Sequence, residues 1–344
     1  MKKDAPIIGR KDDHLQINLK NDVESGISTG LEKLQFEHSA LPEINLSDVN
    51  PSLAFLGKNL KLPLLISSMT GGTPEGLRIN HILAKAADYY GLAMGVGSQR
   101  VAIDHPETLP SFNLRQVVPN ILLLANLGAA QLNYGYGVDE CKLAVDSIQA
   151  DGLILHLNPL QEALQTGGDT DFAGLLGKIE LVCRHLGKPV IVKEVGWGIS
   201  THVARQLMNA GVSAIDVAGA GGTSWSQVEM NRAENDHLRE AALKFRSWGI
   251  PTAQAIHQAQ LGAPGLPIIA SGGLQSGVDI AKCIALGASL TGMAGPLLRA
   301  AAESEESLDR KIEQIKLELT ITMFVTGSPD LKSLHNARFL SPSN

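Results

Sequence analysis

This sequence of 344 residues has little cysteine, no long apolar run and no excess of positive charge. Its three cysteines are widely spaced and form no CxxC pair, which argues against a disulfide framework or a zinc site and favours a reducing cytoplasm. No stretch offers the roughly 20 apolar residues of a membrane span, and no apolar segment follows the lysines near the amino terminus. We therefore expect a cytoplasmic protein without a membrane partner.

The charge balance argues against a second class of partner. The 29 Lys and Arg residues against 35 Asp and Glu residues give a formal net charge of −6, which disfavours binding to nucleic acid. Any anion that the chain binds must therefore be held by a local cluster. With 44% hydrophobic residues, a chain of this length can bury one large core, so we expect residues 1–344 to form a single domain.

Eight short apolar runs recur along the chain, and each is followed by small residues and then a helical pattern. Strands that alternate with helices in this way predict an α/β fold, a (β/α)8 TIM barrel. A doubly wound open sheet would instead place one glycine-rich fingerprint after its first strand, whereas here small residues follow nearly every strand. The predicted strands are residues 62–66, 92–96, 120–124, 152–157, 189–192, 214–217, 267–270 and 289–293.

The predicted barrel, residues 61–300, carries three additions. Residues 1–60 form a polar amino-terminal arm, which we expect to fold over the barrel or to reach a neighbouring subunit. The gap between the sixth and seventh strands is longer than the others and contains a helical pattern within 233–248, which could serve as a lid. Residues 301–344 form a carboxyl-terminal helical segment with apolar residues at helical spacing, expected to pack on the barrel or on another subunit.

Chemistry in such a barrel lies at the carboxyl ends of the strands. The first strand is followed by SSMTGG, whose glycines let the backbone approach a flat or anionic ligand, although such a pair also forms ordinary turns. GSQR follows the second strand, where Arg100 is either a phosphate ligand or a solvated charge at the rim. Asn126 follows the third strand as a neutral donor and acceptor.

The fourth and fifth strands end in the most polar residues of the chain. HLNPLQE places His156 and Asn158 on one face of the strand, although a lone histidine is more often a satisfied core residue. Glu162 is a candidate magnesium ligand, because this ion usually takes one or two protein carboxylates together with phosphate oxygens and water. Lys193 is costly to bury unpaired, so it should face a Schiff-base carbonyl, a phosphate or an electron-rich cofactor.

Glycines follow each of the last three strands, in GGT, SGGL and MAG. Glycine turns after the last two strands form a recurrent phosphate site of such barrels, because their backbone N–H groups and a helix start receive the anion. Tight turns alone would explain one of these sequences more easily than all three. The rim is therefore predicted to bind phosphorylated ligands.

These motifs, together with RKDDH at residues 10–14, resemble the type 2 isopentenyl diphosphate isomerases in order and spacing from about residue 7 to residue 338. The resemblance implies a barrel enzyme that interconverts isopentenyl and dimethylallyl diphosphate and that requires FMN, Mg²⁺ and NADPH, the last to reduce the flavin. It also implies a homo-oligomer, a tetramer or octamer. On its own, RKDDH would be a solvated run of charges.

The resemblance also implies roles for individual residues. Glu162 would hold the metal, and Gln161, His156 and Lys193 would serve catalysis. The substrate would be bound by Arg10, Lys11, His14, Ser98, Gln99, Arg100, Asn158 and Gln161. FMN would be bound by Ser67, Ser68, Met69, Thr70, Ser98, Asn126, Lys193, Thr223, Gly272, Gly273, Leu274, Ala294 and Gly295.

The chemistry favours the flavin as proton carrier, because Gln161 does not titrate usefully and Glu162 is assigned to the metal. We expect Lys193 to stabilise the anionic reduced ring, and the lid and arm to exclude water from a reactive cation. One rival is an FMN-dependent 2-hydroxy-acid oxidase or dehydrogenase, which would need a His base and an Arg clamp near SGGLQSG. Another is a non-catalytic flavin-binding protein, in which RKDDH and HLNPLQE would have no purpose.

Overall fold

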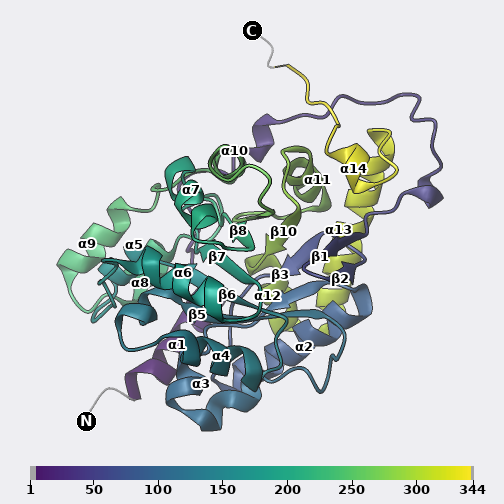
Figure 1. The fold of residues 1–344 in the computed structure, drawn as a ribbon. Helices are drawn as coiled ribbons and strands as arrows, with labels where there is room; N and C mark the ends of the chain where they lie inside the picture. Colours follow the sequence, from purple (N-terminus) through teal and green to yellow (C-terminus); the bar gives the residue numbers. More distant parts are fainter. Residues whose placement is uncertain (1–4, 342–344) are drawn as a thin grey trace.

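Eight parallel strands form a closed barrel in the computed structural model of the chain, which describes residues 5–341 (Figure 1). The strands follow one another in chain order, and the last pairs with the first to close the barrel. All eight predicted strands are confirmed. Their bounds are β3 (Leu64–Ile66), β4 (Ala93–Gly95), β5 (Leu122–Gly128), β6 (Gly152–Leu157), β7 (Val190–Glu194), β8 (Ala214–Asp216), β9 (Ile268–Ser271) and β10 (Leu290–Met293).

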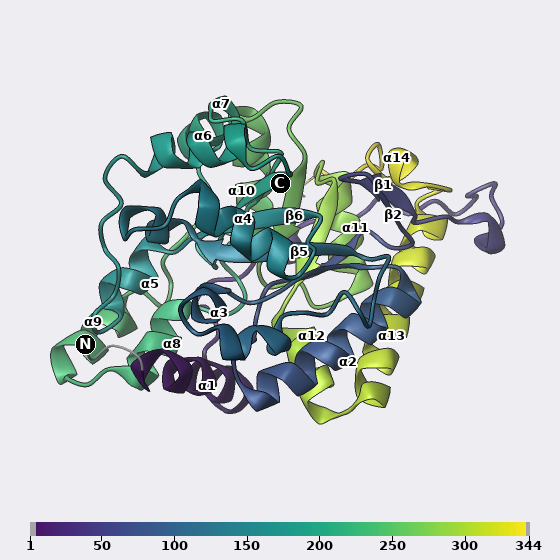
Figure 2. The same cartoon turned by 60° about the horizontal axis from the view of Figure 1, so that its bottom comes forward.

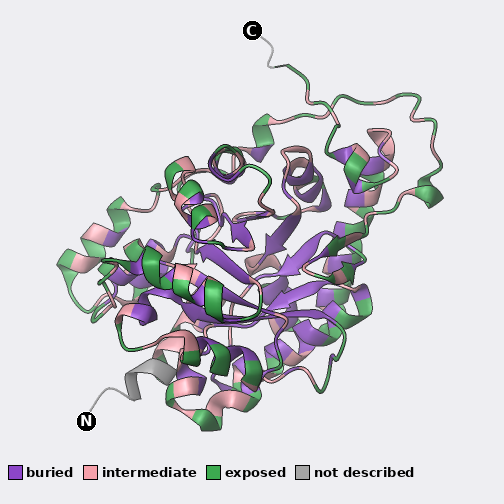
Figure 3. Ribbon diagram, in the orientation of Figure 1, coloured by how far each residue is buried: buried purple, intermediate pink, exposed green. Residues whose placement is uncertain are grey.

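Helices surround the barrel, so that the strands are buried while the outer faces of the helices are exposed (Figure 3). None of the described helices is long and apolar enough to cross a membrane. The helices that follow the barrel strands are α2 (Pro74–Tyr90), α3 (Arg100–Asp104), α4 (Val138–Ser147), α5 (Pro159–Leu164), α6 (Leu175–His185), α7 (Thr201–Asn209), α8 (Trp225–Arg232), α9 (Asp236–Lys244), α10 (Thr252–Gly262), α11 (Gly277–Ala285) and α12 (Gly295–Glu303).

Local sequence signals set where several of these helices begin and end. The Thr73 side chain accepts a hydrogen bond from the backbone N–H of Gly76 and so caps α2, which ends at Gly91 in the left-handed conformation. Ser276 and Asp279 form a reciprocal capping box at the start of α11. These caps place the strand-to-helix turns at the carboxyl end of the barrel.

The lower part of the barrel interior is filled by apolar side chains that point inward from every strand. An antiparallel hairpin, β1 (Leu53–Phe55) and β2 (Lys58–Leu60), precedes the first barrel strand. Its Phe55 and Leu60 are buried in the same apolar cluster. The predicted arm is therefore not one unit, because its last residues close the amino-terminal end of the barrel.

The first part of the arm lies at the opposite end of the barrel. Helix α1 (Ala5–Lys20) packs against α8 and α12 (Figure 2). The chain then runs beside the turn after β8, where the N–H of Ser25 donates to Gly222 O and the N–H of Ser224 donates to Val23 O. The arm thus folds over its own barrel, one of the two predicted alternatives. Residues 1–4 of the predicted arm lie outside the described residues.

The extra segment after β8 forms α8 and α9, as the long gap between strands predicts. The carboxyl-terminal segment forms the long helix α13 (Glu305–Val325) and the short helix α14 (Leu331–Leu334). Helix α13 packs against α2, α11 and α12, so it covers the barrel of its own chain. The predicted apolar side chains are its buried face, namely Leu308, Ile312, Ile315, Leu319 and Met323.

Truncation of this buried face should destabilise the protein. Leu319 is 0% exposed, so Leu319→Ala should lower the free energy of unfolding by about 2–5 kcal/mol through lost burial and a residual cavity. Leu317 on the same helix is 52% exposed, and Leu317→Ala should change that free energy by less than about 0.5 kcal/mol. Urea unfolding followed by circular dichroism measures both, and equal losses would contradict the packing described.

Candidate functional site

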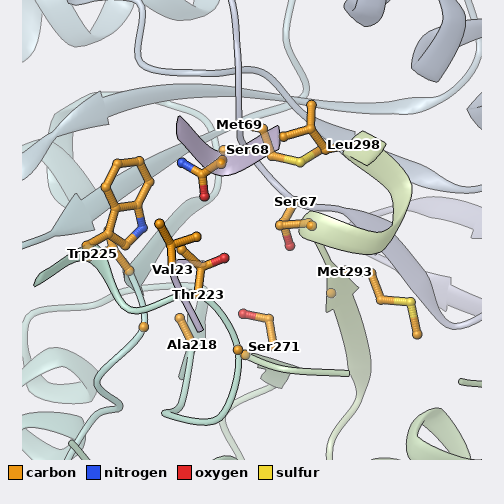
Figure 4. Close-up of a pocket in the computed structure, with 18 of the residues that line it drawn as sticks. Val23, Ser67, Ser68, Met69, Ala218, Thr223, Trp225, Ser271, Met293 and Leu298 are labelled. Carbon is orange, nitrogen blue, oxygen red and sulfur yellow. The ribbon is translucent and has the colours of Figure 1, made fainter. Parts of the chain in front are cut away.

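A cavity of about 1430 Å³ opens at the carboxyl ends of the barrel strands. Figure 4 shows Ser67 and Ser271 from the strand ends, Thr223 and Trp225 from the segment after β8, and Leu298 from α12 around this space. The cavity also reaches the arm, through Arg10, Lys11 and His14. Of the residues predicted from the sequence to form the site, all except Gln99 line this one cavity.

Gln99 corrects the prediction for GSQR. Its side chain is 1% exposed, and its amide donates to Ala144 O at 2.8 Å and accepts from the N–H of Asn126 at 3.0 Å. Both ends of the amide are therefore engaged with backbone groups. Gln99 connects β5 to α4, and its neighbours Ser98 and Arg100 line the cavity instead.

The arm supplies two cations to the cavity wall. Lys11 Nζ donates to Ser98 O at 2.7 Å and lies 4.8 Å from the centre of the Phe112 ring. Burial, together with the charge of Arg10, lowers the pKa of Lys11 to about 7. Asp12 and Asp13 are exposed, and Asp13 Oδ2 lies 3.6 Å from Arg232 Nε. RKDDH is therefore not a uniformly solvated run, because its basic residues turn inward and its acidic residues outward.

Glu229 on α8 is the central acceptor of the arm contact, and the sequence analysis missed it. It is 2% exposed, and its Oε1 lies 3.0 Å from His14 Nε2 and accepts from Gln161 Nε2 at 3.0 Å. Its Oε2 accepts from Arg232 Nη1 at 3.0 Å. The ring of Trp225 meets the His14 ring edge to face at 5.2 Å. One carboxylate therefore joins the arm, α5 and α8.

A second carboxylate, Glu162, lies at the start of α5. It accepts from Asn158 Nδ2 at 2.8 Å and from the N–H of Asp169 at 2.7 Å, and burial raises its pKa. Asn158 Oδ1 is buried without a hydrogen-bond partner among the described residues. Arg100 is paired with Asp169 at 2.5 Å, so it is neither free nor simply solvated. This corner of the cavity therefore offers oxygen ligands next to cations.

His156 is neutral at physiological pH, because burial and the charges of Lys193 and Lys11 lower its pKa to about 4. Its Nδ1 lies 2.9 Å from Asn126 Oδ1. Since Asn126 Nδ2 donates to Val96 O, its Oδ1 is an acceptor and the ring proton lies on Nδ1. His156 Nε2 is thereby left as an acceptor.

The opposite side of the cavity is built from small residues. Ser67 Oγ and Ser68 Oγ are buried and have no hydrogen-bond partner in the described part of the chain. Gly272 has φ +106°, and a Cβ there would lie 2.0 Å from Gly219 O. The glycine turns after β8 and β9 therefore pack backbone against backbone, which leaves their N–H groups and two serine hydroxyls available around the cavity.

Known proteins of similar sequence share one name. The chain is 54% identical to an isopentenyl-diphosphate delta-isomerase of a Synechococcus species over 334 residues, which cover 97% of this chain and 96% of that protein. The protein of the same name from Rickettsia bellii is 50% identical over 330 residues and 96% of both chains. The chain belongs to the isopentenyl-diphosphate delta-isomerase family. The model of the FMN-dependent dehydrogenase family also matches, at residues 161–341.

The fold of this delta-isomerase family member extends to more distant proteins. A solved structure of mandelate oxidase with (S)-2-phenylpropionate superposes with a TM-score of 0.64 at 17% identity, covering 98% of this chain and 97% of that one. At this identity the likeness concerns the fold alone. The (β/α)8 barrel predicted from the strand pattern is thereby confirmed a second time.

Loss of the shared carboxylate should release the arm of this family member. Hydrogen bonds to a charged group contribute about 1.5–3 kcal/mol, so Glu229→Gln should increase trypsin cleavage after Lys11 or Lys20 by about tenfold or more. Glu240→Gln on the exposed side of α9 is the matched control. An arm that is cleaved at the same rate in both variants would show that Glu229 does not hold it.

Proposed function

We propose that this chain interconverts isopentenyl and dimethylallyl diphosphate, using FMN and a magnesium ion in the cavity at the strand ends. The observation that carries the proposal is that two sets of groups suited to phosphorylated ligands line one cavity. Arg10, Lys11 and Glu162 form the first set, and Lys193 with the glycine turns forms the second. The curated relatives of at least 50% identity bear the name of this activity over nearly the full chain.

The residues present fit FMN. Two buried serine hydroxyls that have no partner among residues 5–341, Ser67 Oγ and Ser68 Oγ, offer hydrogen bonds to a polar ring edge. The turn at Gly272 and Gly273 and the start of α12 at Gly295 offer N–H groups to a phosphate. Reduced FMN, when bound, supplies the proton donor and acceptor for the allylic shift.

The first set of groups fits a diphosphate with its metal. Arg10 and Lys11 bring two cations from the arm, and Ser98 lies between Lys11 and Arg100. Glu162 would hold magnesium, and the unpartnered Asn158 Oδ1 next to it marks a place where a ligand is expected. Among the described residues, no cluster of three His, Cys, Asp or Glu side chains forms a metal site made by the protein alone.

Other side chains of the cavity orient the hydrocarbon and exclude water. Gln161 is held at both ends, by Glu229 and by Asn158, so its amide has a fixed direction. His156 accepts and does not donate at Nε2. Trp225 and Leu298 line the cavity, and we infer that α1 and α8 close over it when substrate binds. Lys193 adds a positive charge to the second set of groups.

The geometry gives no support to the rival oxidase chemistry. Such an enzyme needs a His base and an Arg clamp for a carboxylate near the end of β9. The turn after β9 carries Ser271, Gly272, Gly273 and Leu274 instead, without a titratable group. The likeness to mandelate oxidase therefore extends to the barrel and not to the residues that this reaction needs.

Three further features belong to the proposal. NADPH reduces the flavin without being consumed at each turnover, the chain forms a homo-oligomer, a tetramer or octamer, and it acts in the cytoplasm. The family resemblance supports the first two, and the three widely spaced cysteines without a CxxC pair support the third.

The activity itself is directly testable. The purified protein should be yellow with bound FMN, and after anaerobic reduction it should form dimethylallyl diphosphate from isopentenyl diphosphate only when magnesium is present. Glu162→Gln should remove most of the magnesium-dependent rate, whereas Glu180→Gln, on the exposed side of α6, should not. Product analysis by mass spectrometry and NMR measures this, and flavin reduction by mandelate or lactate without isomerisation would favour the oxidase.

Binding of the diphosphate should weaken at alkaline pH. The pKa of Lys11 is about 7, so each pH unit above that value lowers its protonated fraction about tenfold, and the KM should rise in proportion. Lys11→Arg keeps the charge at every pH and should flatten this dependence. Lys142→Arg, at an exposed position of α4 that does not line the cavity, is the control. A KM that is constant from pH 6 to pH 8.5 in the unaltered enzyme would contradict the assignment.

A further inference from the structure

Above the apolar layer of the barrel, the next inward-facing positions form a polar layer. Strand pairing establishes the register, because Ile191 is paired with Ala214 in the apolar layer and Lys193 with Asp216 two residues further on. The strands β4 and β10 contribute Gly95 and Gly292 at the equivalent positions. The polar layer consists of Ser67, Asn126, His156, Lys193, Asp216 and Ser271.

Asp216 is the acidic member of this layer, and neither the sequence analysis nor the proposed mechanism gives it a role. It is 0% exposed. Its Oδ1 accepts from Ser271 Oγ at 2.6 Å and from the N–H of Ala218 at 3.2 Å, while Oδ2 has no hydrogen-bond partner among the described residues. A buried carboxylate with an unpartnered oxygen is costly unless a nearby cation compensates it.

Lys193 is such a cation, and its backbone is paired with that of Asp216 on the neighbouring strand. It is buried at 9% exposure, it lines the cavity, and its Nζ donates to Glu194 O at 2.5 Å. Burial raises the pKa of Asp216, and the charge of Lys193 acts in the opposite direction. The other titratable member, His156, is neutral. Within the layer, charge is therefore carried by this one acid and this one base. Glu194, next to Lys193, is also buried; its Oε2 accepts from the N–H groups of Val195, Gly196 and Trp197, and burial raises its pKa to about 7.

We propose that Asp216 is a positioning residue for Lys193: its carboxylate, held by Ser271, moderates the positive field that the Lys193 side chain places on a bound flavin. This inference rests on the proposed FMN site. According to this inference, Asp216 and Ser271 together control how strongly the site favours the anionic reduced flavin over the oxidised flavin.

The test is the midpoint potential of bound FMN in Asp216→Asn, measured in the full-length holoenzyme. The loss of negative charge should shift the potential in the positive direction, by about tenfold in the ratio of reduced to oxidised flavin, or about 30 mV for a two-electron couple. A merely structural role would not give a positive shift that Ser271→Ala reproduces to a smaller extent.

Two variants serve as controls. Asp151→Asn removes a carboxylate at the amino-terminal end of β6, at the other end of the barrel, and should leave the potential unchanged. Ser271→Ala removes one hydrogen bond to the Asp216 carboxylate and should give a smaller shift in the same direction. If Asp216→Asn does not fold or does not bind FMN, the Ser271→Ala result decides.

The outcomes separate this inference from the proposed function. Unaltered protein that binds no FMN would contradict the proposed function, and with it the basis of this inference. Unaltered protein that binds FMN and isomerises its substrate, together with a potential in Asp216→Asn equal to that of the unaltered protein, would overturn the role of Asp216 alone.

Discussion

The side chains that point inward from the eight strands must fill the closed barrel. They form two successive layers, and the rest of the structure depends on the composition of these layers. The lower layer is apolar on every strand, and Phe55 and Leu60 of the hairpin seal it from below. Water cannot reach the upper layer from that side. The polar side chains above it, among them His156 and Lys193, are therefore partly desolvated and open in one direction only, into the cavity. This loss of hydration is the main reason why the pKa of His156 is lowered to about 4.

The second constraint concerns which elements supply the positively charged side chains of the cavity. The barrel itself brings Arg100 to the rim, but Asp169 already neutralises that guanidinium. Further positive charge comes from Arg10 and Lys11 of the arm, which crosses the cavity mouth and is held there by Glu229. The contact that holds the arm and the contact that orients Gln161 therefore share one carboxylate. In the proposed reaction, substrate binding and closure would be coupled for this reason.

Much of this arrangement could be predicted from the sequence because it is local. Buried parallel strands are continuous apolar runs, and the residues after each run reach the same end of a barrel, so the pattern predicted most of the cavity wall. The hairpin at 53–60 escaped prediction because two three-residue strands carry no periodic signal. Glu229 and Asp169 escaped for a different reason, since their partners lie on other elements and only the tertiary structure brings them together.

Gln99 shows the opposite error. It stands between two cavity residues in GSQR, and sequence adjacency predicted a shared role. The backbone turns between Ser98 and Arg100, so the intervening side chain points into the wall, where two backbone groups need partners. Asp216 is a related case. It ends a short buried run on β8, and its position in the sequence does not predict that it is paired with Lys193 on the neighbouring strand β7.

The central claim is that the cavity at the strand ends carries an allylic proton exchange. The most direct test is to incubate the anaerobically reduced enzyme with isopentenyl diphosphate and magnesium in heavy water and to locate deuterium in the product by NMR. The account predicts deuterium in a methyl group of dimethylallyl diphosphate, at a rate that follows flavin reduction. Product that forms at the full rate without deuterium would contradict exchange with solvent protons at this site.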